Sequence, residues 1–513
     1  MTTQNETRRC PHSRKCGGCQ LQNLTYAEQL EWKNRLCVKL LGRFAHVEPI
    51  LGMENPYHYR NKVQAAFGTT RAGRIISGIY QSSTHNIVAV DSCMTEDRTA
   101  DKIIVDIRRL LADFKMTTYN EVTGRGFLRH VLVKRGFATN EVMVVLVTGT
   151  PIFPARNNFL RALLKLHPEI TTVVQNVNDR YTSMLLGPSE KTLYGPGFIT
   201  DVLCGLKFRI SAKSFYQINP AQTEVLYGKA MEFAGLTGRE TVIDAYCGIG
   251  TIGMIAAKTA GQVLGVEVNR DAVRDAIANA KLNNMKNIRF ICADAGEFMV
   301  DMAQNGERCD VLLMDPPRAG SDQAFLSSAV TLAPTRIVYV SCNPETLARD
   351  LLFLTKRGYR VKKIQPVDMF PHTNHVETVA VLSRKSATKT FIPVTVSPKD
   401  MGLDEAKAQP TYENIRKYVK ETHGLTVSTL NIAQMKAECG LEMECDRSGG
   451  KQQPKCPPEK RAAIIDALIH FGMLDEDARE TEEIPNEQAS RQRPAGFCRM
   501  WAYFLKIFLK NLF

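Results

Sequence analysis

The sequence predicts an α/β protein with a doubly wound parallel sheet, preceded by an α+β domain and followed by a small helical module. Between about residues 206 and 385, short β-branched apolar runs alternate with longer helical stretches, which is the pattern of parallel strands joined by helices. Between residues 45 and 205, short alternating runs are separated by turn residues instead. At 513 residues the chain is long enough for several such domains.

Charge and composition narrow the class of partner. Residues 1–399 carry 50 Lys+Arg against 35 Asp+Glu, whereas the remainder carries 16 against 18, so the positive excess lies before residue 400. A basic body suits a polyanion, although an ordinary basic protein has the same balance. The polar N-terminus and the absence of an 18-residue apolar run predict neither an export signal nor a membrane span. We therefore expect a cytoplasmic protein.

The N-terminal segment, residues 1–44, is rich in cysteine. Three of its cysteines form a C-x5-C-x2-C set: Cys10, Cys16 and Cys19. In a reducing compartment, cysteines serve as metal ligands, nucleophiles or buried apolar groups more often than as disulfides. A structural zinc site usually has two close pairs of ligands, and only one close pair is present here, whereas an iron–sulfur cluster takes four thiolates. Cys37 is the nearest candidate along the chain for the fourth.

A polar helix is expected at residues 26–41, and residues 45–205 then predict a mixed sheet domain. The apolar runs 131–133 and 142–147 are typical of strands. Cations stand beside aromatic residues at 59–62 and at 126–135. Such mixtures suit phosphate contact with base stacking, and they equally suit a solvated basic face.

The following region predicts the parallel sheet. Its expected strands are Thr241–Ala245, Val263–Val268, Ile288–Cys292, Val311–Asp315 and Ile337–Ser341. Its expected helices are Thr251–Thr259, Arg270–Leu282 and Pro344–Lys356. In such sheets, ligands bind beyond the carboxyl ends of the strands, so the residues at those ends are the candidates for chemistry.

The first strand of this sheet runs into a glycine-rich turn. Asp244-Ala-Tyr-Cys-Gly-Ile-Gly-Thr-Ile-Gly253 lets the backbone approach a ligand and directs helix amides at it. Glu267 ends the next strand, 23 residues after Asp244, where a carboxylate can bind both ribose hydroxyls. This Rossmann-like pattern predicts a nucleoside-containing cofactor, and a dinucleotide competes with other identities.

Three later positions add reactive groups. Asp315 precedes two prolines that end its strand and fix the following loop, although two prolines alone would indicate only a turn. Cys342 follows the next strand near a helix N-terminus, where thiolate is favoured, although most cysteines of such proteins are buried apolar groups. Glu377 begins an apolar strand and could be a solvated cap. Paired with a nucleophilic cysteine, it becomes a candidate general base.

Together these motifs resemble the RNA uracil-5-methyltransferases, specifically the iron–sulfur branch that modifies 23S ribosomal RNA. The resemblance spans residues 10 to about 385. It rests on Cys10–Gln20, Tyr59-Arg-Asn-Lys62, Phe215-Tyr-Gln-Ile-Asn219, Asp244–Gly250, Asp315–Gly320, Ser341–Pro344 and His375-Val-Glu377. It implies a class I methyltransferase domain at 206–385, a central RNA-binding domain at 45–205 and an N-terminal iron–sulfur segment.

The resemblance also implies roles for particular residues. Cys342 matches the nucleophile that attacks C6 of uracil, and Glu377 matches the acceptor of the C5 proton. The residues matching contacts to S-adenosyl-L-methionine are Gln217, Tyr246, Thr251, Glu267, Asp294 and Asp315; Thr251 stands where the family often has Asn. A 4Fe–4S cluster would be held by Cys10, Cys16, Cys19 and, in preference to Cys37, Cys93. The implied partner is 23S ribosomal RNA, bound by a monomer, with no DNA and no membrane.

Two other functions remain open from the sequence. A nicotinamide or flavin oxidoreductase would account for the glycine motif and a cluster but not for Asp315, Cys342 and Glu377. A non-catalytic RNA-binding protein would not need the reactive residues. The sequence also leaves open which uridine is modified, transfer RNA as the substrate, and the role of a helical module expected at 399–474 before a disordered tail at 475–513.

Overall fold

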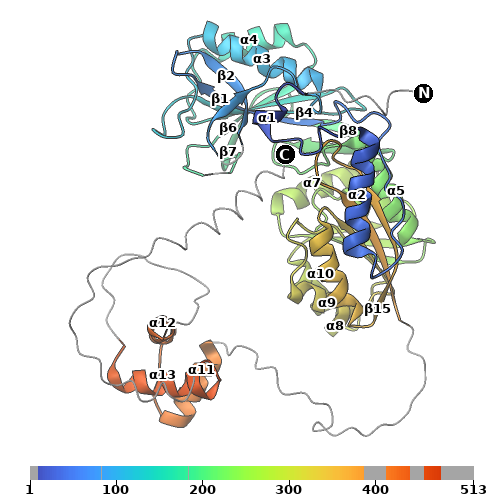
Figure 1. Ribbon diagram of the computed structural model, residues 1–513, viewed down its shortest axis with the longest axis vertical. Helices are drawn as coiled ribbons and strands as arrows, with labels where there is room; N and C mark the ends of the chain where they lie inside the picture. Colours follow the sequence, from blue (N-terminus) through green and yellow to red (C-terminus); the bar gives the residue numbers. More distant parts are fainter. Residues whose placement is uncertain (1–9, 82–83, 183, 386–411, 440–455, 475–513) are drawn as a thin grey trace. The chain divides into compact units, whose positions relative to one another are not determined.

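The computed structural model describes residues 10–81, 84–182, 184–385, 412–439 and 456–474 (Figure 1). The described residues fall into two compact units, one spanning 10–385 and the other spanning the helices between 412 and 474. The predicted tail at 475–513 lies outside the described residues, as does the segment 386–411. No helix in the described ranges is both long and apolar enough to cross a bilayer.

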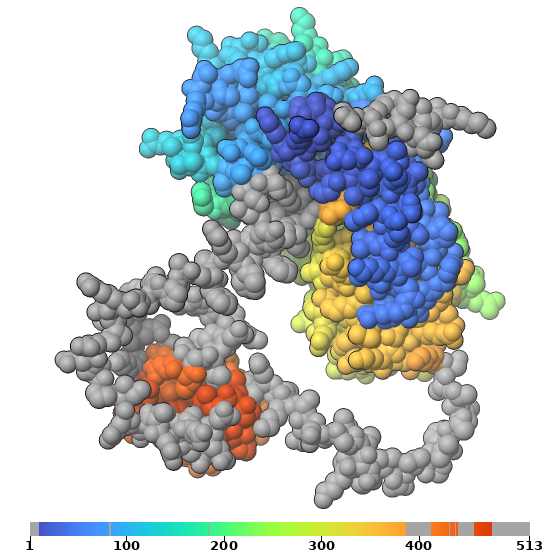
Figure 2. Space-filling model, viewed as in Figure 1, coloured from blue at the N-terminus to red at the C-terminus, as the bar shows by residue number. Residues whose placement is uncertain are grey.

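The N-terminal segment forms α1 (Ser13–Cys16) and α2 (Tyr26–Leu41), and the second matches the predicted helix. A capping box starts α2: the Glu28 amide donates to Thr25 Oγ1 at 3.3 Å, and the Thr25 amide donates to Glu28 Oε2 at 2.7 Å. Cys37 and Leu41, on the inner face of α2, are buried in the core of the parallel sheet described below, which lies between residues 241 and 384. Figure 2 shows this N-terminal part in blue, lying directly against the orange segments from the end of the same unit.

The central domain is a mixed sheet in the order β3-β2-β1-β4-β5-β6-β7. Its strands are β1 (Lys62–Thr69), β2 (Ile75–Tyr80), β3 (Ile87–Ala89), β4 (Leu128–Arg135), β5 (Val142–Thr148), β6 (Ile170–Val177) and β7 (Ser189–Tyr194). The helices α3 (Arg98–Asp113) and α4 (Arg156–Leu166) pack on one face, as Figure 1 shows. Val142–Thr148 is buried throughout, which explains why that strand is a continuous apolar run.

The hairpin of β8 (Phe198–Leu203) and β9 (Leu206–Ser211) packs on the other side of that sheet. Leu132 and Met143 of the central sheet share one apolar cluster with Phe208 of the hairpin and Leu226 beyond it. The predicted boundary between residues 205 and 206 falls in the turn of this hairpin. The central and following domains are therefore joined by a continuous core.

The second sheet has the order β12-β11-β10-β13-β14-β16-β15. Its strands are β10 (Thr241–Ala245), β11 (Gln262–Glu267), β12 (Ile288–Cys292), β13 (Val311–Met314), β14 (Arg336–Ser341), β15 (Tyr359–Val367) and β16 (Glu377–Arg384). Its helices are α5 (Pro220–Ala234), α6 (Thr251–Ala257), α7 (Arg270–Leu282), α8 (Ala295–Gln304), α9 (Gln323–Leu332) and α10 (Pro344–Thr355). The predicted strands and helices are confirmed, with ends shifted by one or two residues.

The direction of β16 determines the site. β10 to β14 are mutually parallel, whereas β16 runs antiparallel to β14, with Thr378 opposite Ser341. The start of β16 therefore lies at the same edge as the ends of the parallel strands. Glu377 and Cys342 are brought to neighbouring positions at this edge.

The second unit contains α11 (Tyr412–His423), α12 (Thr429–Glu438) and α13 (Pro458–His470), three helices in the region where a helical module is expected. They bury a separate apolar cluster that includes Ile415, Val419, Ile432, Met435 and Ile464. This unit has its own core.

Candidate active site

The glycine-rich turn joins β10 tightly to α6. Gly250 has φ +84° as the N-cap of α6, and a Cβ there would lie 2.6 Å from the Phe290 ring. The Gly253 amide donates to Asp244 Oδ2 at 2.8 Å, and a Cβ at Gly253 would lie 2.6 Å from the same oxygen. Burial raises the pKa of Asp244 to about 8 although the Gly253 amide opposes the shift. Both glycines are needed for close packing of the helix on the strand.

Glu267 lies beside this turn at the end of β11. Its Oε2 accepts from the Gly248 amide at 3.1 Å, and its Oε1 accepts from the Asn269 amide at 2.8 Å. The carboxylate is half-buried, and a side chain added at Gly248 would meet open space. A fixed acid beside an open backbone turn has the geometry that a ribose diol requires.

Gln217 and Thr251 approach the same region from the loop before α5 and from the start of α6. Gln217 is buried in the loop before α5, and the Tyr227 hydroxyl lies 3.4 Å from Thr251 Oγ1. Burial raises the pKa of Tyr227, and the negative charge of Asp315 adds to the increase, so Asp315 is near. Gln217, Thr251 and Asp315 therefore surround one tyrosine.

Tyr246 directly follows β10, and Asp294 lies just after the end of β12. Tyr246 has φ +63°, and its ring centroid lies 4.9 Å from that of Phe325. Asp294 is exposed and caps α8, where its Oδ1 accepts from the Gly296 amide at 2.8 Å and from the Glu297 amide at 3.1 Å. The observed contacts of Asp294 are thus those of a helix cap, and a cofactor contact there stays a prediction.

This strand edge fits a nucleoside-containing cofactor. The turn has open space at Gly248, and the Glu267 carboxylate lies beside it. The buried polar side chain of Gln217 lies in the loop before α5. The predicted cofactor residues all lie at the edge formed by β10, β11, β12, β13 and the loop before α5.

Cys342, Glu377 and Asp315 form an electrostatically coupled group. Burial raises the pKa of Cys342, and the negative charges of Glu377 and Asp315 raise it further, whereas Arg318 lowers it. Burial and then Asp315 raise the pKa of Glu377 well above its ordinary value, against the effect of Arg318. Burial raises the pKa of Asp315 to about 7. Only Glu377 is nearly inaccessible among these three, at 4% exposure, while Cys342 and Asp315 are half-buried.

Arg318 is a site residue that the sequence interpretation missed. Its Nη2 lies 2.7 Å from His375 Nδ1, and its backbone carbonyl accepts from the Thr346 hydroxyl at 3.3 Å, so its loop is tied to the helix after Cys342. The available signal was a cation directly after Asp315-Pro-Pro. The structure places this cation beside the thiol and the carboxyl.

The predicted cluster cysteines are grouped only in part. Burial raises the pKa of Cys19 to about 11, with Arg60 opposing the shift and the thiolates of Cys16 and Cys10 adding to it. Burial disfavours the charge of Arg60, but surrounding anionic groups that include Cys93 raise its pKa. In the described residues, no group of three or more His, Cys, Asp or Glu side chains is close enough to hold a metal ion. In the described residues, these thiols therefore do not form a metal site.

The two candidates for the fourth thiol differ in surroundings. Cys37 is fully buried in the apolar cluster of the second sheet. Cys93 is half-buried in a segment whose next residue, Met94, accepts at its Sδ from Gln22 Nε2 at 3.9 Å. Cys93 and Cys19 both act on the charge of Arg60, whereas Cys37 lies among apolar side chains, which favours Cys93.

The structure departs from both interpretations of residues 59–62 and 126–135, an RNA-contacting surface or a solvated basic face, because several of these side chains are buried. Tyr59 is 1% exposed, and Asn61 Nδ2 donates to the Gln217 carbonyl at 3.0 Å. Arg129 is 3% exposed and is paired with Glu121 at 2.7 Å. These side chains instead hold the central domain together and attach it to the loop of Gln217.

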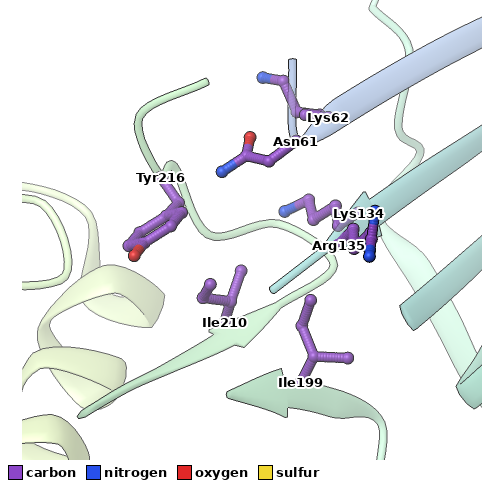
Figure 3. Close-up of a pocket in the computed structure, with 7 residues that line it drawn as sticks. All are labelled: Asn61, Lys62, Lys134, Arg135, Ile199, Ile210 and Tyr216. Atoms are coloured by element: carbon purple, nitrogen blue, oxygen red, sulfur yellow. The ribbon is translucent and has the colours of Figure 1, made fainter. Parts of the chain in front are cut away.

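Figure 3 shows the seam, the place where the central domain meets the loop of Gln217. The seam encloses a cavity of about 10 Å³. Lys134 Nζ donates to the carbonyls of Ser211 and Ser214, both at 2.8 Å, and burial, with the nearby charge of Lys62, lowers its pKa to about 7. The volume suits about one water molecule. This seam is an internal contact of the first unit.

Comparison with known proteins agrees with this geometry. The family model described as tRNA (uracil-5-)-methyltransferase matches residues 203–385. An RNA methyltransferase of Halalkalibacterium halodurans is 45% identical over 382 residues, covering 74% of this chain and 83% of that protein. An RNA methyltransferase of Staphylococcus aureus is 41% identical over 393 residues, covering 75% and 86%.

A solved structure extends the likeness to most of the first unit. The tRNA (uracil-54, C5)-methyltransferase of Pyrococcus abyssi, in complex with S-adenosyl-L-homocysteine, is 31% identical with a TM-score of 0.60. The match covers 73% of this chain and 87% of that one. The strand-end site and these relatives together show that the chain belongs to the RNA (uracil-5-)-methyltransferase family.

Proposed function

We propose that this protein is an S-adenosyl-L-methionine-dependent enzyme that methylates C5 of a uridine in 23S ribosomal RNA. The observation that carries the proposal is the juxtaposition of Cys342 with Glu377, beside Asp315, at the edge that also carries the nucleoside-binding turn. A nucleophile, a base and a cofactor site on one edge suit substitution at an unreactive ring carbon.

The chain's own residues account for the covalent steps. Attack of Cys342 Sγ on C6 forms an S–C6 bond and moves the electron pair of the C5–C6 double bond toward C5, which becomes nucleophilic. S-adenosyl-L-methionine, when bound, would supply the methyl group that C5 takes up, and its S–CH3 bond would break to leave S-adenosyl-L-homocysteine. The Glu377 carboxylate then takes the C5 proton, the C5–C6 double bond re-forms, and the S–C6 bond breaks with its electron pair returning to Sγ.

Other residues of the site have proposed roles in stabilising charge and in orienting the uracil or the cofactor. Arg318 is placed to stabilise the Cys342 thiolate, and the Arg318–His375 contact limits where its guanidinium can lie. Asp315 is placed to orient the uracil or the cofactor. Gln217, Tyr246, Thr251, Glu267 and Asp294 complete the proposed cofactor contacts. The complex of the Pyrococcus abyssi relative with S-adenosyl-L-homocysteine supports a cofactor of this kind.

The substrate must leave its base stack to reach Cys342, because the thiol lies at a half-buried strand end. Extruding a base costs roughly a few kcal/mol. Phe215, which is 52% exposed and lies in the loop of Gln217 with Lys62 Nζ 5.8 Å from its ring, offers a stacking surface there. As part of the proposal, the central domain binds the RNA, and the enzyme acts as a monomer in the cytoplasm.

The reaction is tested by trapping its adduct. With 5-fluorouridine at the target position, the C5 proton is replaced by fluorine that Glu377 cannot remove, so a stable Cys342–RNA adduct should form and survive denaturing electrophoresis. Cys342→Ser should abolish the adduct while binding RNA normally. Tight RNA binding by the wild type without an adduct would refute the mechanism.

Ribosomal RNA is preferred as the substrate because the cysteine pattern is that of the ribosomal branch. Transfer RNA is the second candidate, because the Pyrococcus abyssi relative is a tRNA methyltransferase. Mass spectrometry of 5-methyluridine in both RNA classes, from a strain with and without the gene, separates them. Loss from transfer RNA alone would overturn the ribosomal assignment.

The same branch assignment includes a 4Fe–4S cluster on Cys10, Cys16, Cys19 and Cys93. It is supported by the shared surroundings of Cys16, Cys19 and Arg60, and by the contact between Gln22 and Met94. Anaerobically purified protein should contain about four iron and four sulfide per chain. Cys93→Ser should lower that content, and Cys37→Ser should not. Iron-free protein from anaerobic, iron-supplemented cells would contradict the assignment.

A further inference from the structure

The loop between β15 and β16, residues 368–376, carries His375 and leads directly into Glu377. It is here named the base loop. It has no regular strand pairing, so its backbone groups must find other partners. Some of those partners come from the start of α5 and from the central domain. Others come from the N-terminal segment, more than 300 residues earlier in the chain, and include two buried side chains of α2 that the proposed chemistry does not use.

The first is Lys33. Its Nζ donates to Asp368 Oδ1 at 2.6 Å and to the Phe370 carbonyl at 2.9 Å, and both charged side chains are 0% exposed. Asp368 Oδ2 accepts from the Tyr26 hydroxyl at 2.9 Å. A buried ion pair is a weak source of stability, because desolvation offsets much of the attraction, but it strongly restricts the positions of its two partners.

The second is Gln29. The His372 amide donates to Gln29 Oε1 at 2.9 Å, and Gln29 Nε2 donates to His372 Nδ1 at 3.2 Å. His372 Nε2 then donates to the Pro56 carbonyl at 3.0 Å, which assigns the neutral ring. His372 has φ +70°, a backbone conformation that a histidine keeps only when its surroundings impose it.

Leu21 of the same segment and Tyr59 of the central domain complete the attachment. The Leu21 amide donates to the His372 carbonyl at 3.0 Å, and the Tyr59 hydroxyl donates to the Pro371 carbonyl at 3.1 Å. Beyond these contacts, His375 meets Arg318 and the chain enters β16 at Glu377. The position of the carboxylate thus depends on the antiparallel pairing of β16 with β14 and β15, in which Glu377 lies opposite Val367, and on this attachment of the loop that precedes it.

We propose that Lys33 and Gln29 are positioning residues, which hold the base loop through Asp368 and His372 and so set the Glu377 carboxylate for removal of the C5 proton. This inference rests on the proposed role of Glu377. It assigns the N-terminal segment a part in the second half of the reaction. Attack by Cys342 and methyl transfer do not require the carboxylate and should be less affected.

Because the carboxylate acts only after methyl transfer, its displacement predicts kinetics that a general loss of active protein does not. If the carboxylate is displaced, the methylated Cys342–RNA adduct still forms but loses its C5 proton slowly, so the adduct accumulates on ordinary RNA. Proton removal also becomes rate-limiting, so deuterium at C5 of the target uridine slows turnover more than in the wild type. A displacement of about 1 Å can lower such a step by about 100-fold.

The main variant is Gln29→Met, which removes both bonds to His372 while keeping length and helix propensity. Lys33→Met/Asp368→Leu removes both charges together and leaves none unpaired. Tyr26→Phe deletes one hydroxyl and keeps the ion pair. Lys39→Met, an exposed position on the same helix, is the matched control.

We expect Gln29→Met and the double variant to lower kcat about 10- to 100-fold with less than about a threefold change in kcat/KM for RNA, because the steps through methyl transfer are not slowed. The adduct fraction on ordinary RNA and the isotope effect on kcat should both rise, with Tyr26→Phe following in the same direction and Lys39→Met matching the wild type. A parallel fall of kcat and adduct at an unchanged isotope effect, in every variant that folds, would overturn the inference, because it describes loss of active protein only.

Glu377→Gln separates the two proposals. It should accumulate the adduct and turn over very slowly. If it does and the α2 variants do not, only the positioning role is wrong. If Glu377→Gln forms no excess adduct, the assignment of Glu377 as the base is itself wrong.

Discussion

At the scale of single residues, the site combines a thiol and two carboxyls whose pKa values are all raised by burial. The two nearby carboxyls add to the effect of burial on Cys342, and Asp315 adds to it for Glu377. Arg318 opposes this for both Cys342 and Glu377. The nucleophile therefore depends on a cation that does not itself react.

Replacing that cation should shift the pH dependence of the first step. Arg318 lowers the pKa of Cys342, so Arg318→Met should raise that pKa, and a higher pH is then needed for the same thiolate fraction. The acid limb of the rate of adduct formation with 5-fluorouridine RNA should move up by about one pH unit. Arg318→Lys, which keeps the charge, should move it less. An unmoved limb in Arg318→Met would show that Arg318 does not act on the thiol.

At the scale of elements, the turn between β10 and α6 depends on glycine for two separate reasons. Gly250 needs both a positive φ and space beside Phe290. The predicted glycine motif identified the turn, but the clash with Phe290 depends on β12, which lies 40 residues later in the chain.

Gly250→Ala should therefore cost more than backbone strain alone. Gly306 provides the control, because it has φ +72° and a side chain added there meets nothing within 4 Å. Gly306→Ala should lower the free energy of unfolding by about 1 to 2 kcal/mol. Gly250→Ala should add about 1 to 3 kcal/mol for overpacking and weaken cofactor binding, as measured by urea denaturation and calorimetry. Equal losses in the two variants would exclude the Phe290 contact as a cause.

At the scale of the whole molecule, the first unit contains every described residue of the proposed site, and the second has its own apolar cluster. The central and methyltransferase domains share a core, so they are expected to unfold together. The helical unit is not needed to complete that core.

A chain ending at residue 398 should consequently keep the fold and chemistry of the first unit. Its thermal midpoint for the main transition should lie within about 2 °C of the full-length value, and adduct formation should proceed at a similar rate. RNA affinity measured beside these tells whether the helical unit binds RNA. Loss of adduct formation by a folded truncated protein would show that the helical unit takes part in the reaction.

The sequence by itself determined the parallel strands, the glycine turn and the reactive residues at the strand ends, because apolar period and chain order are local properties. Cys342, Asp315 and Glu267 could be found this way. The tertiary structure decided what depends on distant segments: that β16 runs antiparallel and so carries Glu377 to Cys342, that Arg318 lies beside both, and that α2 holds the base loop. It also showed that residues such as Arg129 and Tyr59, which looked suited to RNA, are buried contacts. A charge pattern along the chain does not distinguish a cation that faces solvent from one that is paired inside.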